Sequence, residues 1–150
     1  MIFQVYLFVM IILGLCSALA VFSYRYGLEY LVATYISFII AASFLANKFV
    51  SYGPFEIPSA SIIASATFFI TDLVSELWGK KESSKIAKSG LVALGVLVVA
   101  QYISQIWPCS PSGLHKCMQF DQVLGMTPRI ILASFIAFIV SQHVDIYLFH

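Results

Sequence analysis

Acidic and hydroxyl side chains recur on one side of an otherwise apolar segment near the middle of the chain. Spacings of four, seven and four residues separate Ser61, Ser65, Asp72 and Glu76. At 100° per residue in an α-helix, this spacing confines all four to about 60° of arc. Carboxylates accept hydrogen bonds and hydroxyls both donate and accept, so such a face can bind a polar ligand.

A second apolar segment, near the end of the sequence, carries a similar face. Its members fall within about 40° of helical arc: Ser134, Ser141 and Asp145. Gln142 lies on the flank of this face, and an offset of 69 positions places Glu76 on Asp145, the kind of match that an internal repeat leaves. One interpretation is that two helices line one polar site. The alternative is that the hydroxyl groups bond to their own helices or mediate helix packing.

The composition indicates whether the folded chain is surrounded by water or by lipid. Of 150 residues, 10% are charged and 61% are hydrophobic, with a mean hydropathy of +0.95, whereas a soluble domain has roughly 25% charged residues. A soluble fold of this size buries only about 70% of the surface of its unfolded chain. The net charge of +1 also excludes a nucleic-acid binder, which needs a clustered basic surface. The sequence therefore predicts a protein embedded in a bilayer.

Charged residues divide the chain into five apolar segments, each close to the roughly 20 residues that cross a membrane. We predict an all-α polytopic membrane protein with a single domain over 1–150 and helices near 1–23, 30–50, 57–79, 88–107 and 129–149. Residues 80–88 are predicted to be a solvated loop, and 108–128 a long polar loop. Because the first segment lacks a basic start and is long for a signal peptide, we expect it to be retained.

Lysines set the expected orientation. Four of them lie between the third and fourth predicted helices: Lys80, Lys81, Lys85 and Lys88. By the positive-inside rule this loop is cytoplasmic, which places the N-terminus and the loop over 108–128 outside.

Four further polar residues have a functional and a structural interpretation. Asn47, at the end of the second segment, offers a donor and an acceptor or simply ends a helix. Gln101 and Gln105, four residues apart, form a polar stripe that equally fits bonding to a neighbouring helix. Arg129 opens the fifth segment, where it either neutralises a carboxylate in the membrane or extends to the surface.

The cysteines and histidines form no metal-ligand pattern, and the chain has no HExxH, Walker or GxSxG motif. We therefore expect no metal, no cofactor and no enzymatic activity. Cys109 and Cys117 share one polar segment, so they form a disulfide if that segment is outside, or remain two free thiols.

Three motifs in order carry a family resemblance: Ala46-Asn47-Lys48-Phe49-Val50; Thr71-Asp72-Leu73-Val74-Ser75-Glu76-Leu77-Trp78-Gly79-Lys80-Lys81; and Arg129 to Phe138 with Ser141 to His150. Together they resemble the bacterial queuosine precursor transporter family, also called the vitamin uptake transporter family. The resemblance implies an importer of 7-cyano- or 7-aminomethyl-7-deazaguanine in the bacterial cytoplasmic membrane, working by alternating access. The positions matching the family's polar motifs, which we expect to bind substrate, are Asn47, Asp72, Glu76, Arg129, Gln142 and Asp145.

Members of that family continue with further apolar helices, whereas this sequence ends at His150. We therefore expect the chain to be incomplete relative to the family, either as a fragment or as a shortened product. The alternative function is a non-transporting membrane scaffold or partner subunit, or an inactive fragment of the transporter. Expected partners are a small nucleobase and membrane lipid, with no nucleic acid, and a homo-oligomer is left open.

Overall fold

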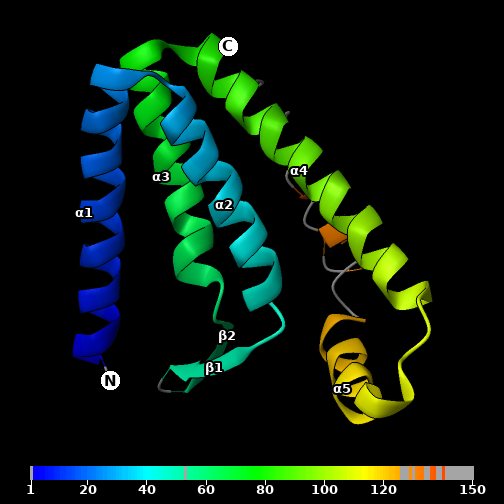
Figure 1. Ribbon diagram of the computed structural model, residues 1–150. Coiled ribbons are helices and arrows are strands. Elements are labelled where there is room, and N and C mark those ends of the chain that lie inside the picture. The colour runs from blue at the N-terminus through cyan, green and yellow to red at the C-terminus, as the bar shows by residue number, and fades with distance from the viewer. Residues whose placement is uncertain are drawn as a thin grey trace. The chain divides into compact units, whose positions relative to one another are not determined.

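The computed structural model of the protein describes residues 2–52, 54–125, 129, 131–133, 136, 137 and 140 (Figure 1). The chain divides into two compact units, residues 1–93 and 94–150, and each is described by itself.

The first unit begins with two helices joined by a tight turn. Helix α1 (Ile2–Tyr26) and helix α2 (Glu29–Leu45) are apolar along their length. Gly27 has φ of 132°, a left-handed conformation that side chains disfavour, and its N–H donates to the Ser23 carbonyl at 2.8 Å. Glycine therefore ends α1 and lets the chain reverse.

A short β-hairpin connects α2 to the next helix. Strands β1 (Phe49–Tyr52) and β2 (Phe55–Pro58) are antiparallel, with Val50 opposite Ile57. The sequence analysis extended the second helix to residue 50 and began the third at 57, and both boundaries were wrong. Aromatic and β-branched residues favour strands, and Ser59 fastens the hairpin by donating from its N–H to the Lys48 carbonyl at 2.7 Å.

Helix α3 (Ser61–Trp78) ends at Gly79, which has φ of 90°, and helix α4 (Lys80–Ile106) follows directly. The predicted loop over 80–88 is therefore wrong, because these residues are the first turns of α4. Lysine, glutamate and alanine are good helix formers, and Lys85 pairs with Glu82 at 2.6 Å one turn away. The four lysines are nevertheless exposed on the helix surface.

The core of the first unit lies between α1, α2, α3 and the beginning of α4. Its buried residues are Cys16, Ala20, Leu31, Tyr35, Ala66, Ile70, Val74 and Ile86. At Gly90, α4 approaches α2 so closely that an added Cβ would overlap Ile39 and Tyr35. Burial of apolar side chains at this close contact stabilises the unit.

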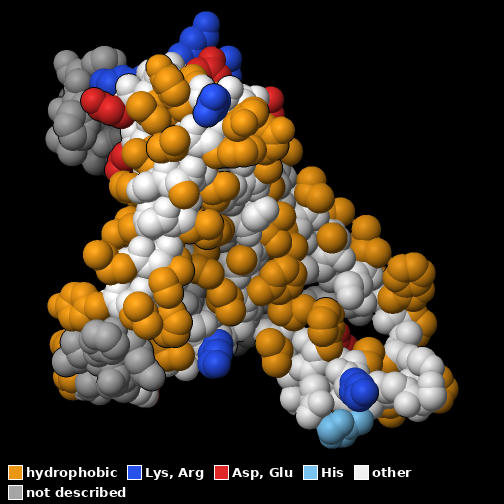
Figure 2. Space-filling model, turned by 60° about the vertical axis from the view of Figure 1, so that its left-hand side comes forward, with side chains coloured by type: hydrophobic (Ala, Val, Ile, Leu, Met, Phe, Trp, Pro, Cys, Tyr) orange, Lys and Arg blue, Asp and Glu red, His pale blue; other side chains and the backbone are white. Residues whose placement is uncertain are grey.

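Among the residues that the structure describes, three helices are long and apolar enough to cross a membrane: Tyr6–Tyr26, Ser61–Trp78 and Lys80–Ile106. Helix α2 is apolar but shorter. Figure 2 shows hydrophobic side chains spread along the visible face of the helices among uncharged groups and backbone, with few charged side chains between them. Lipid-facing helices expose apolar side chains in this way, and the predicted fold class, an all-α polytopic membrane protein, is confirmed.

The second unit contains the rest of α4 and a short helix that the sequence analysis did not predict. A 3-10 turn (Pro111–Gly113) leads into helix α5 (Leu114–Leu124), within the segment expected to be a polar loop. Of the predicted helix over 129–149, the described residues 129, 131–133, 136, 137 and 140 are helical. The single domain over 1–150 stays a prediction.

Candidate functional site

The predicted polar face of α3 is turned away from the core. Asp72, Glu76 and Ser65 are exposed, whereas the buried residues of α3 are Ala66, Ile70 and Val74. At 100° per residue the two sets point in nearly opposite directions. The carboxylates can therefore reach only a ligand, lipid headgroups, water or another segment beside α3.

Neither carboxylate is neutralised within the part of the chain that the structure describes. The single ion pair found there joins Lys85 to Glu82, and no hydrogen bond reaches the side chain of Asp72 or Glu76. An ionised group in a spanning helix costs at least about 2.5–3.5 kcal/mol on insertion scales. Such residues normally face a cavity or a partner, so Asp72 and Glu76 remain candidates for ligand contact.

A groove beside this face runs between α1 and α3. It has a volume of about 300 Å³ and is lined by Val9, Ile12, Leu13, Ser61, Ile62, Ser65 and Ala66. This volume is at the lower end for small-molecule sites, which hold a ligand between apolar walls with a few polar groups. The spacing along α3 places Asp72 about 10 Å from Ser65 along the helix axis.

The two groove serines already use their hydroxyl protons. Ser61 Oγ donates to the Pro58 carbonyl at 2.7 Å, and Ser65 Oγ donates to the Ser61 carbonyl at 2.8 Å. Their remaining capacity is to accept a hydrogen bond. The groove therefore offers two acceptors to a ligand that carries N–H groups.

Asn47 is half-buried and contributes to the end of α2. Its Nδ2 donates to the Phe44 carbonyl at 3.3 Å and lies 3.5 Å from the Ser43 carbonyl. The Phe44 carbonyl also accepts from the backbone N–H of Asn47 at 3.4 Å, and both carbonyls lie in the last turn of the helix, where α-helical partners run out. The structural interpretation of Asn47, as a helix-ending residue, therefore has direct support.

The other predicted substrate-binding residues belong to the second unit. Arg129 is helical and exposed. Gln142 and Asp145 lie outside the described residues, so the second polar face cannot be placed. Substrate binding by all six predicted residues stays a prediction.

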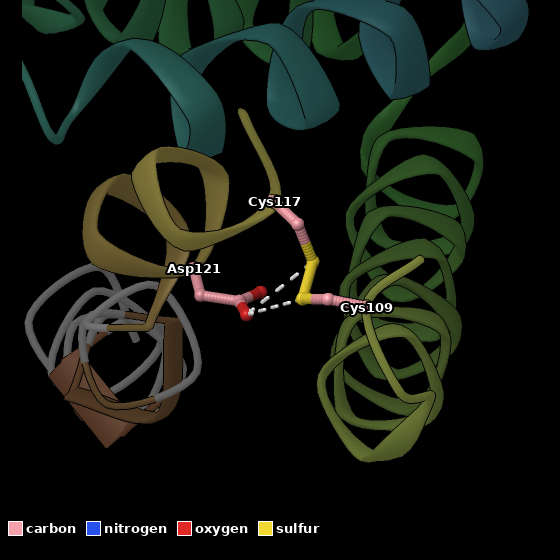
Figure 3. The surroundings of a disulfide bond; sticks show 3 residues. All are labelled: Cys109, Cys117 and Asp121. Carbon is pink, nitrogen blue, oxygen red and sulfur yellow. Dashed lines mark hydrogen bonds between the residues drawn. A yellow bond between two sulfur atoms is a disulfide. The ribbon is translucent and has the colours of Figure 1, made fainter. Parts of the chain in front are cut away.

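Cys109 and Cys117, whose pairing was left open, form a disulfide with their Cα atoms 5.9 Å apart. The carboxylate of Asp121 lies beside it, with Oδ2 4.0 Å from Cys109 Sγ and 3.9 Å from Cys117 Sγ (Figure 3). Sulfurs in a disulfide are not thiolates, so this cluster is a covalent crosslink rather than a set of metal ligands. It fastens α5 to the segment that follows α4.

The two glutamines of α4 differ sharply in their surroundings. Gln105 donates from Nε2 to the Leu124 carbonyl at 3.4 Å, which confirms that it bonds to a neighbouring helix. Gln101 is 6% exposed, and within the described chain neither polar atom of its amide has a hydrogen-bond partner. Both residues had the same interpretation in the sequence analysis, because spacing alone contains no information about burial.

Apolar helices of spanning length, one of them with a polar face and an adjoining groove, define a polytopic membrane protein. Residues 58–150 match the family model described as "Putative vitamin uptake transporter". Since this match covers more than half of the chain, the protein belongs to the vitamin uptake transporter family, as the resemblance predicted. The family is one of transporters, not enzymes.

A curated relative in Bacillus subtilis (strain 168), named "Probable queuosine precursor transporter", is 30% identical over 90 residues. The match covers 59% of this chain and 38% of the relative, so the chain aligns with well under half of that protein. No solved structure matches the chain.

Proposed function

We propose that this chain takes part in importing 7-deazaguanine precursors of queuosine across the bacterial cytoplasmic membrane by alternating access. The observation that carries the proposal is the exposed face of α3, where Asp72 and Glu76 lie within the family-matched segment. The name of the Bacillus subtilis relative supports the choice of substrate.

The chemistry of the substrate suits these side chains. A deazaguanine carries a ring N–H beside an exocyclic amine, and a carboxylate such as Asp72 can accept both hydrogen bonds. The amides of Asn47 and Gln142 can donate to its carbonyl group. Glu76, Asp145 and Arg129 complete the proposed set, with Arg129 balancing the acidic charge.

We propose that the lysine-rich start of α4 faces the cytoplasm and that the N-terminus is outside. Within the first unit, the α1–α2 turn with Arg25 and the α3–α4 turn with Lys80 lie at the same end (Figure 1). This arrangement gathers basic residues on one side, as the positive-inside rule requires of a cytoplasmic face.

The disulfide supports the same orientation, because disulfides persist in oxidising compartments outside the cytoplasm. A membrane-impermeant maleimide applied to intact cells should label Cys109 and Cys117 only after treatment with an impermeant reductant. Cys16 is buried and serves as an internal control. Labelling that requires a permeable reductant and permeabilised cells would reverse the proposed orientation.

Uptake tests the proposed transport. A queuosine-auxotrophic bacterium without its own importer is supplied with a low concentration of precursor, and queuosine in its tRNA is measured. The wild-type chain should restore queuosine. Asp72→Asn should abolish this restoration while the amount of protein in the membrane stays the same.

Glu82→Gln is the matched control. Glu82 is an acidic residue with a surface ion pair to Lys85, and such a pair contributes only about 0–1 kcal/mol. This variant should transport normally. Retained uptake by Asp72→Asn would remove Asp72 from the site, and no restoration by the wild-type chain would contradict the proposed function.

A second function, a membrane scaffold or partner subunit, is favoured by the hydroxyl groups of α3. Ser65, Thr67 and Thr71 all donate to carbonyls of their own helix, and satisfied hydroxyls of this kind are common where membrane helices pack. Co-purification of a second membrane protein, together with no effect on precursor uptake, would support this alternative.

A further inference from the structure

The side chain of Gln101 is buried but unpaired. It is 6% exposed, and both Oε1 and Nε2 lack a hydrogen-bond partner within the described residues. It lies one helical turn before Gln105, whose amide bonds to the Leu124 carbonyl. The two glutamines thus lie on the same face of α4 but differ: Gln105 links two helices, whereas the amide of Gln101 makes no hydrogen bond within the described residues.

An unused amide at this position is unfavourable for folding alone. A buried donor or acceptor left without a partner costs about 1–3 kcal/mol, and a bilayer supplies no water to replace the missing bonds. Leucine at this position would avoid the penalty. A residue that lowers stability and makes no stabilising contact is expected where it serves binding rather than folding.

Ser23 shows why the observation is specific to Gln101. Its hydroxyl is also buried and unpaired, with the residue 1% exposed. A helical serine can, however, rotate its hydroxyl toward a carbonyl one turn earlier in its own helix. The longer amide of Gln101 carries two polar atoms, and no single rotation within its own helix satisfies both.

The side-chain amide has an acceptor atom, Oε1, and a donor group, Nε2, and a partner that satisfies it must match both. Phosphates and carboxylates offer only acceptors and would leave Oε1 unpaired, whereas ammonium and guanidinium groups offer only donors and would leave Nε2 unpaired. A neutral edge with an N–H beside a carbonyl satisfies both atoms through two parallel hydrogen bonds. The lactam edge of a flat heterocycle has this arrangement.

We propose that Gln101 is a substrate-binding residue that pairs through both amide atoms with the lactam edge of a neutral heterocycle. The inference rests on the proposed function and deepens it, since a 7-deazaguanine carries such an edge. This pairing is a neutral, specificity-determining contact that uses the ring N–H and the ring carbonyl, so the exocyclic amine of the base is the donor left for a carboxylate of the proposed set.

The test measures binding of 7-deazaguanine to the whole chain in lipid nanodiscs by calorimetry. Gln101→Leu should weaken binding by about 10- to 100-fold, the loss expected for two hydrogen bonds and the lactam groups left unpaired. Without ligand, the same variant should melt at a higher temperature than the wild type, because it removes an unsatisfied amide.

Gln105→Leu is the matched control. It removes the bond to the Leu124 carbonyl, so it should melt at a lower temperature while binding 7-deazaguanine within about threefold of the wild type. A merely structural role for Gln101 would instead give both variants the same loss of thermal stability.

A modified probe keeps the test independent of any variant's folding. 1-Methyl-7-deazaguanine lacks the lactam N–H and should bind the wild type about as weakly as the parent base binds Gln101→Leu. In that variant the methyl group should have little further effect, because both changes remove the same contact.

The outcomes separate the two proposals. This inference is overturned if Gln101→Leu binds 7-deazaguanine as tightly as the wild type does, or if the wild type binds the methylated and parent bases equally. Either result leaves the proposed function standing. No binding of 7-deazaguanine by the wild type would contradict the proposed function itself, and this inference with it.

Discussion

The backbone of α4 passes against the ring of Tyr35 at Gly90, where an added Cβ would stand 2.7 Å from Tyr35 Cε1 and closer still to Ile39 Cδ1. Tyr35 is 2% exposed and belongs to the core cluster of the first unit. Its ring therefore has little room to move, and only glycine permits the approach of α4 to α2.

Gly90→Ala should therefore destabilise the protein, although alanine is the better helix former. Overpacking a filled contact typically costs 1–3 kcal/mol, against about 0.8–1.0 kcal/mol gained in helix propensity. We expect a lower melting temperature by thermal denaturation in nanodiscs. Gly95→Ala is the control, because a Cβ there meets nothing within 4 Å, and it should be neutral or stabilising. Equal behaviour of the two variants would contradict the close packing.

Ser83 links α4 to α3 and offers a second matched pair. Its Oγ donates to the Thr71 carbonyl at 2.9 Å, whereas Ser89 Oγ donates at 3.0 Å to Lys85 in its own helix. Ser83→Ala should cost about 1 kcal/mol, the usual net value of a hydrogen bond. Ser89→Ala should have a smaller effect, since alanine favours the helix. Chemical denaturation compares the two, and a larger loss at Ser89 would contradict the link.

Hydropathy predicted the apolar helices of the first unit well, because a bilayer imposes both the length and the composition of a spanning segment. The error at 80–88 came from treating charge as a sign of a loop. Lys85 and Glu82 form helices as readily as many apolar residues, and an exposed helix end is solvated as fully as a loop.

The remaining differences depend on contacts distant in sequence. Ser59 Oγ bonds to the Leu45 carbonyl 14 residues away, and this closure of the hairpin leaves no periodic pattern in the sequence. The polar face of α3 was predictable from spacing alone, since helical geometry fixes which residues share a face. Which of Gln101 and Gln105 would be left unpaired was not predictable, because it depends on the position of the Leu124 carbonyl.

The disulfide should control the local stability of α5. Closing a short loop removes unfolded-state entropy equivalent to about 2–3 kcal/mol, and the Cys109–Cys117 bridge spans eight residues. Replacing both cysteines by serine should speed amide hydrogen exchange across α5, measured by mass spectrometry, while exchange in α3 is unchanged. Unchanged protection of α5 would show that the Gln105 bond and packing hold it without the crosslink.

The groove between α1 and α3 gives the sharpest test of where a ligand lies, because Ser65 can be changed in two opposite ways. Ser65→Ala removes a hydroxyl that donates to its own helix, so it should alter stability by less than about 1 kcal/mol and lower uptake only partly, through the loss of one of the two groove acceptors. Ser65→Phe places a large apolar ring in a space of about 300 Å³. We expect it to block precursor uptake while the amount of protein in the membrane stays normal, since the groove is open and no core side chain must shift.

Ile63→Phe is the volume control, because Ile63 is absent from the groove lining and gains a similar aromatic ring. It should transport as the wild type does. Uptake by Ser65→Phe at the wild-type rate would place the substrate path elsewhere, whereas loss of uptake in both variants would show that α3 tolerates no added bulk. Only selective loss at Ser65 identifies the groove as part of the path, because both variants then carry the same ring on the same helix.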